Sequence, residues 1–122
     1  MAQDGADAAG FEIGVRRGGS PLVPYWSFAM KDTSAQSSVT VTAMSPTAIT
    51  TVDAGRWTLV TGSFDAAEKK LRLYVDGALV AQVDRAAAPW PATGRFAVGR
   101  GFSAGASSNF WNGSIAGVQV FD

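Results

Sequence analysis

Apolar and polar residues alternate along most of this chain, and that alternation is typical of antiparallel strands with one buried face. It is clearest in the stretch LRLYVD at 71–76. The Asp76-Gly77 pair predicts a tight hairpin turn there, because glycine tolerates the positive φ that such turns require. Residues 78–83 (ALVAQV) then form the second strand of the hairpin.

A further strand precedes this hairpin. Trp57, Leu59 and Phe64 fit its buried face, and the charged stretch at 65–70 is too short to form more than a turn. Asp65 follows an apolar strand directly, so its side chain can cap that turn by accepting backbone N–H groups. Residues 56–84 are therefore predicted to form a three-stranded antiparallel meander.

Short alternating runs also flank the meander, at residues 11–16, 25–30, 39–43, 95–100 and 114–121. Glycine, proline and serine separate these runs, and residues 101–109 are expected to form a Gly/Ser-rich loop. The side chains expected in the core are Trp26, Phe28, Met30, Phe96, Val98, Ile115, Val118 and Val120. Roughly eight or nine short strands predict an all-β fold, an antiparallel β-sandwich or jelly roll.

Composition narrows the classes of function. The 122 residues suffice for a single domain, 1–122, with one core. Basic and acidic residues balance at ten each, and no basic stripe exists, so nucleic acid is not an expected partner. No apolar run approaches the ~20 residues that span a bilayer, so membrane insertion is not expected either.

Cysteine and histidine are absent. Their absence removes disulfides, thiolate metal sites, cysteine nucleophiles and Ser-His-Asp catalysis. The G-x-G element at 99–101 precedes no helix, so it predicts a strand end with a permissive turn and not a phosphate cradle.

Three stretches together resemble the second half of bacterial laminin-G-like, concanavalin A-like jelly-roll domains. They are RWTLVTGSFDAAEKKLRLYVDGALV, GRFAVGRG and FWNGSIAGVQVFD. The matching motifs fall on Trp57, 62–65, 71–77, Gly99-Arg100 and 110–121. The resemblance implies a noncatalytic recognition module that binds a glycan or a protein through its rim loops. It also implies an exported bacterial protein, extracellular or at the cell surface, although this chain carries no signal segment.

The chain departs from the resembled family at its start. Those domains begin with further strands before the region equivalent to AQDG at 2–5, so this chain is expected to be a truncated fragment of a larger exported protein. A strand missing beside the closing one leaves an edge that can pair with another chain. We expect a strand-complementing partner, a second copy in a homodimer, or rearranged strands to fill it. The alternative function is therefore a structural or assembly subunit.

A second departure concerns metals. Relatives often close with I-D-D-V, where this chain has Ile115-Ala116-Gly117-Val118. Calcium takes six to eight oxygen ligands, several of them carboxylates. No D-x-D-x-D cluster occurs, so no cofactor and no metal ligands are predicted. Loop carbonyls combined with Asp32, Asp65 or Asp122 leave calcium as the alternative.

Catalysis is not expected. The resembled fold includes glycosidases, which need two carboxylates flanking the scissile bond. The two glutamates are Glu12, on a strand without an acidic partner two residues on, and Glu68, beside two lysines. Both are expected to be solvated surface residues. Glycoside hydrolysis is therefore the third and least favoured function.

Aromatic and polar residues near the loops are the candidate ligand-binding set. Sugars stack their C–H faces on aromatic rings, while amide and guanidinium groups supply directional hydrogen bonds. The candidates are Trp90, Arg100, Phe102, Asn109, Trp111 and Asn112. The alternative for Trp111 is that it closes the end of the sandwich together with Phe110.

Overall fold

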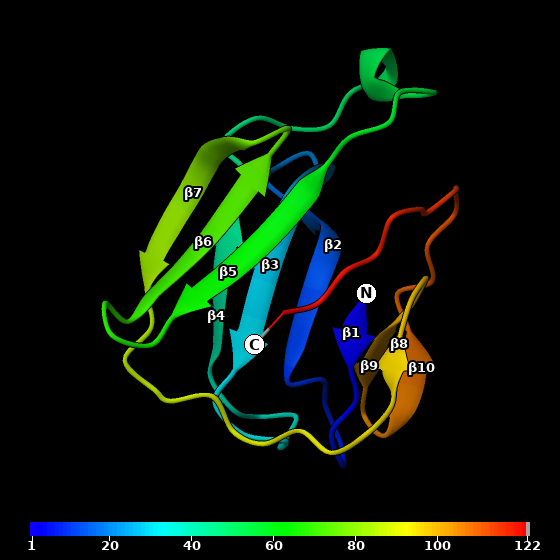
Figure 1. The fold of residues 1–122 in the computed structure, drawn as a ribbon. Helices are drawn as coiled ribbons and strands as arrows, with labels where there is room; N and C mark the ends of the chain where they lie inside the picture. The colour runs from blue at the N-terminus through cyan, green and yellow to red at the C-terminus, as the bar shows by residue number, and fades with distance from the viewer. Residues whose placement is uncertain (122) are drawn as a thin grey trace.

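The computed structural model describes residues 1–121, which form ten β-strands and one 3₁₀ helix (Figure 1). The elements are β1 (Ala2–Gln3), β2 (Phe11–Gly18), β3 (Val23–Lys31), β4 (Thr40–Met44), η1 (Thr51–Asp53), β5 (Val60–Asp65), β6 (Lys70–Val75), β7 (Ala78–Asp84), β8 (Phe96–Ala97), β9 (Gly101–Ser103) and β10 (Ala106–Ser108). No helix in this part of the chain is long and apolar enough to cross a membrane.

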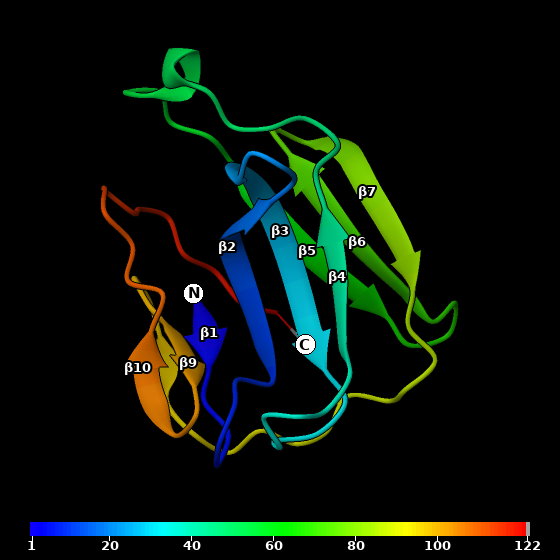
Figure 2. The same ribbon diagram turned by 180° about the vertical axis from the view of Figure 1, so that it is seen from behind.

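The strands form two facing sheets and a small hairpin. One sheet has the order β4-β3-β2-β1-β8 and the other β5-β6-β7, while β9 and β10 pair with each other. Every pairing is antiparallel. The three-stranded sheet lies over the β3–β4 side of the larger one (Figures 1 and 2). The predicted all-β antiparallel sandwich is confirmed, with three very short strands, β1, β9 and β10, that the sequence pattern does not resolve.

The core lies between the two sheets. Phe28, Ala43, Leu71 and Leu73 are buried there, and alternating residues of β2, β3, β5 and β7 pack around them. Trp26 and Met30 belong to this packed layer, as their alternation with polar residues predicts. The opposite residues of β2 and β3 consequently face away from the core.

The predicted meander is present. Phe64 pairs with Leu71 across β5 and β6, and Lys70 with Asp84 across β6 and β7. Asp76 and Gly77 both have positive φ, at 50° and 82°. That conformation matches the right-handed twist of the flanking strands, which is why Asp-Gly is favoured in two-residue hairpins.

The prediction that Trp57 and Leu59 share a buried face with Phe64 is wrong. They are 70% and 63% exposed. Both lie before β5, and their odd numbers place them opposite to Val60 and Phe64, which face the core. Side chains two residues apart share a face, so an odd and an even position cannot do so in a regular strand.

The prediction of a final strand at 114–121 with a buried face is also wrong. These residues belong to no strand, and Ile115, Val118 and Val120 are 42%, 44% and 52% exposed. The segment runs beside β5, on the same side of the large sheet, in both views (Figures 1 and 2). No hydrogen bond joins its backbone to β5 or to another strand of residues 1–121, so the segment stays irregular although its sequence is typical of a strand.

Two smaller differences lie just before this segment. The expected strand 95–100 is reduced to β8, and its Phe96 and Val98 are 46% and 51% exposed. The expected loop 101–109 instead contains the β9–β10 hairpin. Ala104 and Gly105 adopt positive φ at its tip, a conformation that the small side chain of alanine tolerates at a cost.

A buried arginine ties β7 to the end of β3. Arg85 is 1% exposed, and its guanidinium lies 3.3 Å from the Asp32 carboxylate. It also donates to the Lys31 carbonyl at 3.0 Å and lies 5.1 Å from the centre of the Phe64 ring. A charge buried this deeply needs such partners, because desolvation alone would be costly.

Gly62 sets the distance between the sheets, and we expect Gly62→Ala to be destabilising. A Cβ at this position would lie 2.4 Å from Cγ of Phe28. Overpacking of this kind costs about 1–3 kcal/mol. Urea unfolding measures the loss. Gly18→Ala is the control, because its Cβ would meet only ordinary contacts from 3.5 Å; equal losses in both variants would contradict the prediction.

The Asp65 turn predicts a pH dependence of stability. The carboxylate accepts the N–H groups of Glu68 at 2.9 Å and Ala67 at 3.0 Å, and these bonds lower the pKa of Asp65 below its ordinary value of 3.8. A pKa that is lower in the folded state stabilises the protein above the unfolded value and loses that contribution as pH falls through the folded value.

Asp65→Asn should therefore reduce the loss of unfolding free energy on going from neutral pH to well below 3.8, because asparagine does not titrate. Urea unfolding of both proteins at the two pH values measures it. An unchanged acid sensitivity in the variant would mean that other carboxylates carry the effect.

Candidate functional site

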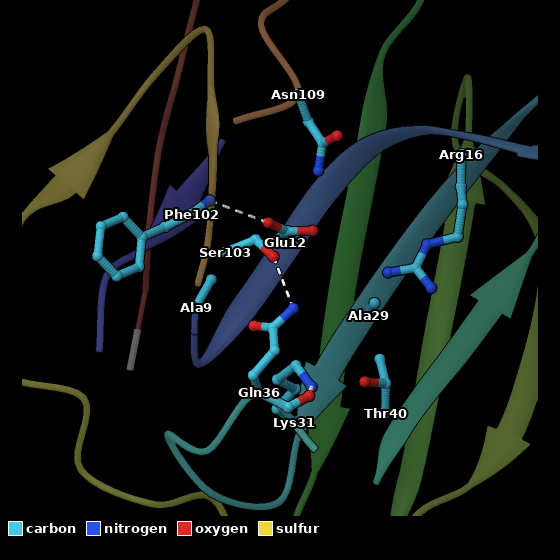
Figure 3. A pocket seen from close by; sticks show the side chains of 10 residues that line it. All are labelled: Ala9, Glu12, Arg16, Ala29, Lys31, Gln36, Thr40, Phe102, Ser103 and Asn109. Atoms are coloured by element: carbon cyan, nitrogen blue, oxygen red, sulfur yellow. Dashed lines mark hydrogen bonds between the residues drawn. The ribbon is translucent and has the colours of Figure 1, made fainter. Parts of the chain in front are cut away.

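A groove of about 210 Å³ opens on the outer face of the five-stranded sheet (Figure 3). Its lining comes from β2, β3, β4, the 32–39 loop and the β9–β10 region. The residues are Ala9, Glu12, Arg16, Ala29, Lys31, Gln36, Thr40, Phe102, Ser103 and Asn109. Glu12 and Ala29 are paired across β2 and β3, and they alternate with core residues Phe11 and Phe28. The same alternation that fills the core therefore turns this row outward.

Small side chains leave room for the groove. Ala9 and Ala29 are 4% and 3% exposed, and they lie below the longer polar side chains. The hairpin forms one wall, held to the body by the Ala9 amide, which donates to the Phe102 carbonyl at 3.1 Å, and by a bridge between Ala8 and Ser103.

Glu12, on β2, is held against the hairpin wall. The expectation that its side chain is freely solvated is therefore wrong. The residue is only partly exposed, and its carboxylate accepts the Phe102 amide at 3.2 Å (Figure 3). Gly101 makes this approach possible, since a Cβ there would lie 2.5 Å from Oε1 of Glu12. Glu68, by contrast, is exposed, as expected, and pairs with Arg72.

Gln36 joins the 32–39 loop, the second wall of the groove, to the β9–β10 hairpin. Its side-chain amide donates to the Ser103 hydroxyl at 2.7 Å and accepts the Ala104 amide at 3.1 Å. The Gln36 backbone amide also donates to Asp7, at 3.0 Å. Lys31 stabilises the same loop, because its ammonium donates to the carbonyls of Gln36 and Ser38 at 2.8 and 3.1 Å. The groove is therefore held in shape by bonds between segments far apart in the sequence.

Of the six residues predicted to bind a ligand, Phe102 and Asn109 line the groove. Figure 3 shows the Asn109 amide pointing toward Glu12, whereas the Phe102 ring points away from the groove. That ring lies 5.8 Å from the Arg100 guanidinium, in a cation–π contact. Phe102 thus contributes its backbone to the groove and offers no stacking face there.

Arg100 and Trp90 are occupied elsewhere. Arg100 donates two hydrogen bonds to the carboxylate of Asp4, at 2.7 and 2.8 Å, and this pairing raises the pKa of Arg100. The indole N–H of Trp90 donates to the Lys31 carbonyl at 3.1 Å. Its ring packs so closely on Gly5 that a Cβ there would lie 2.4 Å from the ring carbon Cη2.

Trp111 and Asn112 also lie outside the groove. The Trp111 ring stacks on Trp26, with centroids 6.0 Å apart and an interplanar angle of 26°. This contact is the one expected if Trp111 closes the end of the sandwich. Asn112 is exposed. Two of the six predicted residues therefore line the groove, and the other four lie outside it.

The sequence reasoning missed most of the groove. Glu12, Arg16, Lys31, Gln36 and Thr40 were not among the candidates, although Glu12, Arg16 and Lys31 occupy the polar positions of two alternating strands. Strand alternation could have shown which face they share. The convergence of the 32–39 loop with the hairpin depends on long-range contacts that no local pattern encodes.

The acidic residues considered for calcium have other roles. Asp32 contacts Arg85 and Asp65 caps its turn, while Asp122 lies outside the described residues. Among residues 1–121, no three acidic side chains gather as a metal site would require.

Loss of the ion pair between Asp4 and Arg100 should destabilise the fold. Arg100→Ala should lower the melting temperature, because it leaves the carboxylate of Asp4, a residue that is 7% exposed, without its cation. Thermal unfolding followed by circular dichroism measures it. Arg17→Ala, at an exposed arginine, is the control. An Arg100→Ala protein as stable as the wild type would show that the pair is not structural.

The comparison with known proteins agrees with this architecture. Residues 1–122 match the family model described as the concanavalin A-like lectin/glucanases superfamily. No curated protein and no solved structure matches the chain. The antiparallel sandwich of two sheets is the fold that this family predicts, and the match covers every residue. The chain therefore belongs to the laminin-G-like domains of the concanavalin A-like lectin/glucanase superfamily.

Proposed function

We propose that this chain is a noncatalytic recognition module that binds carbohydrate in the groove on the outer face of the five-stranded sheet. The observation that carries the proposal is the convergence of polar side chains from five parts of the chain over a floor of two alanines. An exported or surface-attached location accords with this role and is part of the proposal.

The groove offers the chemistry that a polyhydroxylated ligand needs. Asn109 and Thr40 supply amide and hydroxyl groups, Arg16 supplies a guanidinium, and Glu12 has a second carboxylate oxygen besides the one that accepts the Phe102 amide. Sugar hydroxyls both donate and accept, so a mixture of such groups suits them. The alanine floor accommodates the less polar C–H surface of a ring.

The number of carboxylates that line the groove favours a binding role over a hydrolytic one. Glu12 is the one carboxylate among the groove-lining residues of the described chain. Glycosidases of the usual type need a pair, one acting as acid and the other as base or nucleophile. The Glu12 carboxylate is also held in place as the acceptor of the Phe102 amide, which suits a fixed, directional hydrogen-bonding group.

Asn109→Ala should weaken oligosaccharide binding by about twofold to tenfold, the effect of losing one ligand hydrogen bond worth roughly 0.5–1.5 kcal/mol. Titration calorimetry with sugars selected from a glycan panel measures it. Asn112→Ala is the matched control, because it removes the same side chain from an exposed position outside the groove.

No binding across a broad panel would overturn the carbohydrate proposal, and equal losses in the Asn109 and Asn112 variants would overturn the location. Release of reducing sugar from a bound oligosaccharide, abolished by Glu12→Gln, would replace recognition with catalysis.

A further inference from the structure

The groove on the outer face of the five-stranded sheet contains an arginine whose charge the protein itself does not use. Within residues 1–121 the guanidinium of Arg16 forms no ion pair. By contrast, Arg72, Arg85 and Arg100 each pair with a carboxylate. Of the arginines left unpaired in this part of the chain, Arg16 is the one that lines the groove. Its guanidinium is therefore available to a ligand there.

Strand geometry places Arg16 over a floor of small residues. Residues 12, 14 and 16 share the outer face of β2, because alternate residues of a strand point to the same side. Gly14 has no side chain, and its cross-strand neighbour Ser27 is 5% exposed. Figure 3 shows the Arg16 side chain extending into the groove in the direction of Ala29. A ligand that rests on this floor would lie beside the guanidinium.

Glu12, the carboxylate of the groove, lies nearer to Lys31 than to Arg16. Glu12 is opposite Ala29 in the pairing of β2 with β3, so Lys31 is its diagonal neighbour, with ~7–8 Å between their Cα atoms. Arg16 is four residues along the strand from Glu12, or ~13 Å at the usual rise. The Lys31 ammonium donates to two uncharged carbonyls, so its charge remains to offset that of Glu12. The positive charge of Arg16 is therefore the unbalanced one.

The two ends of this row of residues offer different chemistry. At one end, the planar guanidinium of Arg16 presents paired donors that match the two oxygens of a carboxylate. At the other end, the Asn109 amide points toward Glu12, whose second carboxylate oxygen can accept a hydroxyl (Figure 3). A ligand that carries an anionic group at one end and hydroxyls at the other would satisfy both.

We propose that the groove is specific for acidic sugars, with the sugar carboxylate paired to Arg16 and the sugar hydroxyls bonded to Glu12 and Asn109. This inference rests on the proposed carbohydrate binding, and it adds the class of sugar and the residue that selects it. Hydrogen bonds between ionised groups are roughly twice as strong as neutral ones. The carboxylate would therefore decide between sugars that are otherwise alike, and Arg16 is the specificity-determining residue.

Matched pairs of oligosaccharides test the inference. Oligomers of galacturonic, glucuronic and mannuronic acid, each as the free acid and as its methyl ester, are titrated into the protein by calorimetry. For a sugar that binds, the free acid should bind about tenfold to a hundredfold more tightly than the ester, the effect of hydrogen bonds to a charged group. The preference should narrow as the salt concentration rises, because partly exposed charges are screened.

Arg16→Gln should abolish the preference for the free acid, and Arg16→Lys should retain part of it, because lysine keeps the charge but not the planar fork. Arg17→Gln is the matched control, since Arg17 is exposed and alternation turns it to the other face of β2. Arg16→Gln should melt at the wild-type temperature, because Arg16 has no ion pair to lose within residues 1–121.

Equal binding of acid and ester by the wild type, or equal effects of Arg16→Gln and Arg17→Gln, would overturn this inference. The carbohydrate proposal would survive that result if the bound sugar still depended on Asn109. Tighter binding of a sulfated sugar than of its carboxylated counterpart would overturn the choice of carboxylate. Failure to bind any sugar, acidic or neutral, would overturn both proposals.

Discussion

The contact between Phe28 and the bare backbone of Gly62 is the constraint on which the rest of the molecule depends. A ring that meets Cα, with no Cβ in between, fixes both the spacing of the two sheets and the rotation of β3 about its own axis. Once Phe28 points inward, Ala29 must point outward, and its cross-strand neighbour Glu12 must do the same. The floor and the acidic wall of the groove are therefore set by a core contact on the opposite face of the same sheet.

The local sequence pattern predicts those parts of the fold that depend only on residues close together in the chain. The Asp76-Gly77 turn, the Asp65 cap and the alternation of β3 each depend on neighbouring residues, and each was predicted. Trp57 and Leu59 are exposed although apolar, because their odd positions face away from the side on which Phe64 packs into the core. The closing segment was misplaced because a strand sequence becomes a strand only when another strand supplies its backbone partners.

The candidate site shows the same division. The candidate residues are all aromatic or polar side chains near loops, and two of them, Phe102 and Asn109, line the groove. Trp90, Arg100 and Trp111 instead contact Lys31, Asp4 and Trp26, which are distant in sequence. Side-chain type says what a residue can bind, whereas the fold decides whether that capacity is already used within the protein.

The groove combines parts of different origin. Ala29 on its floor belongs to β3 and is 3% exposed, whereas Gln36 and Asn109 lie in the 32–39 loop and just after β10. Loops accept substitutions and insertions more readily than the strands that carry them. The shape and polarity of the groove can therefore diverge between relatives while the core stays the same, so one scaffold can be adapted to different ligands.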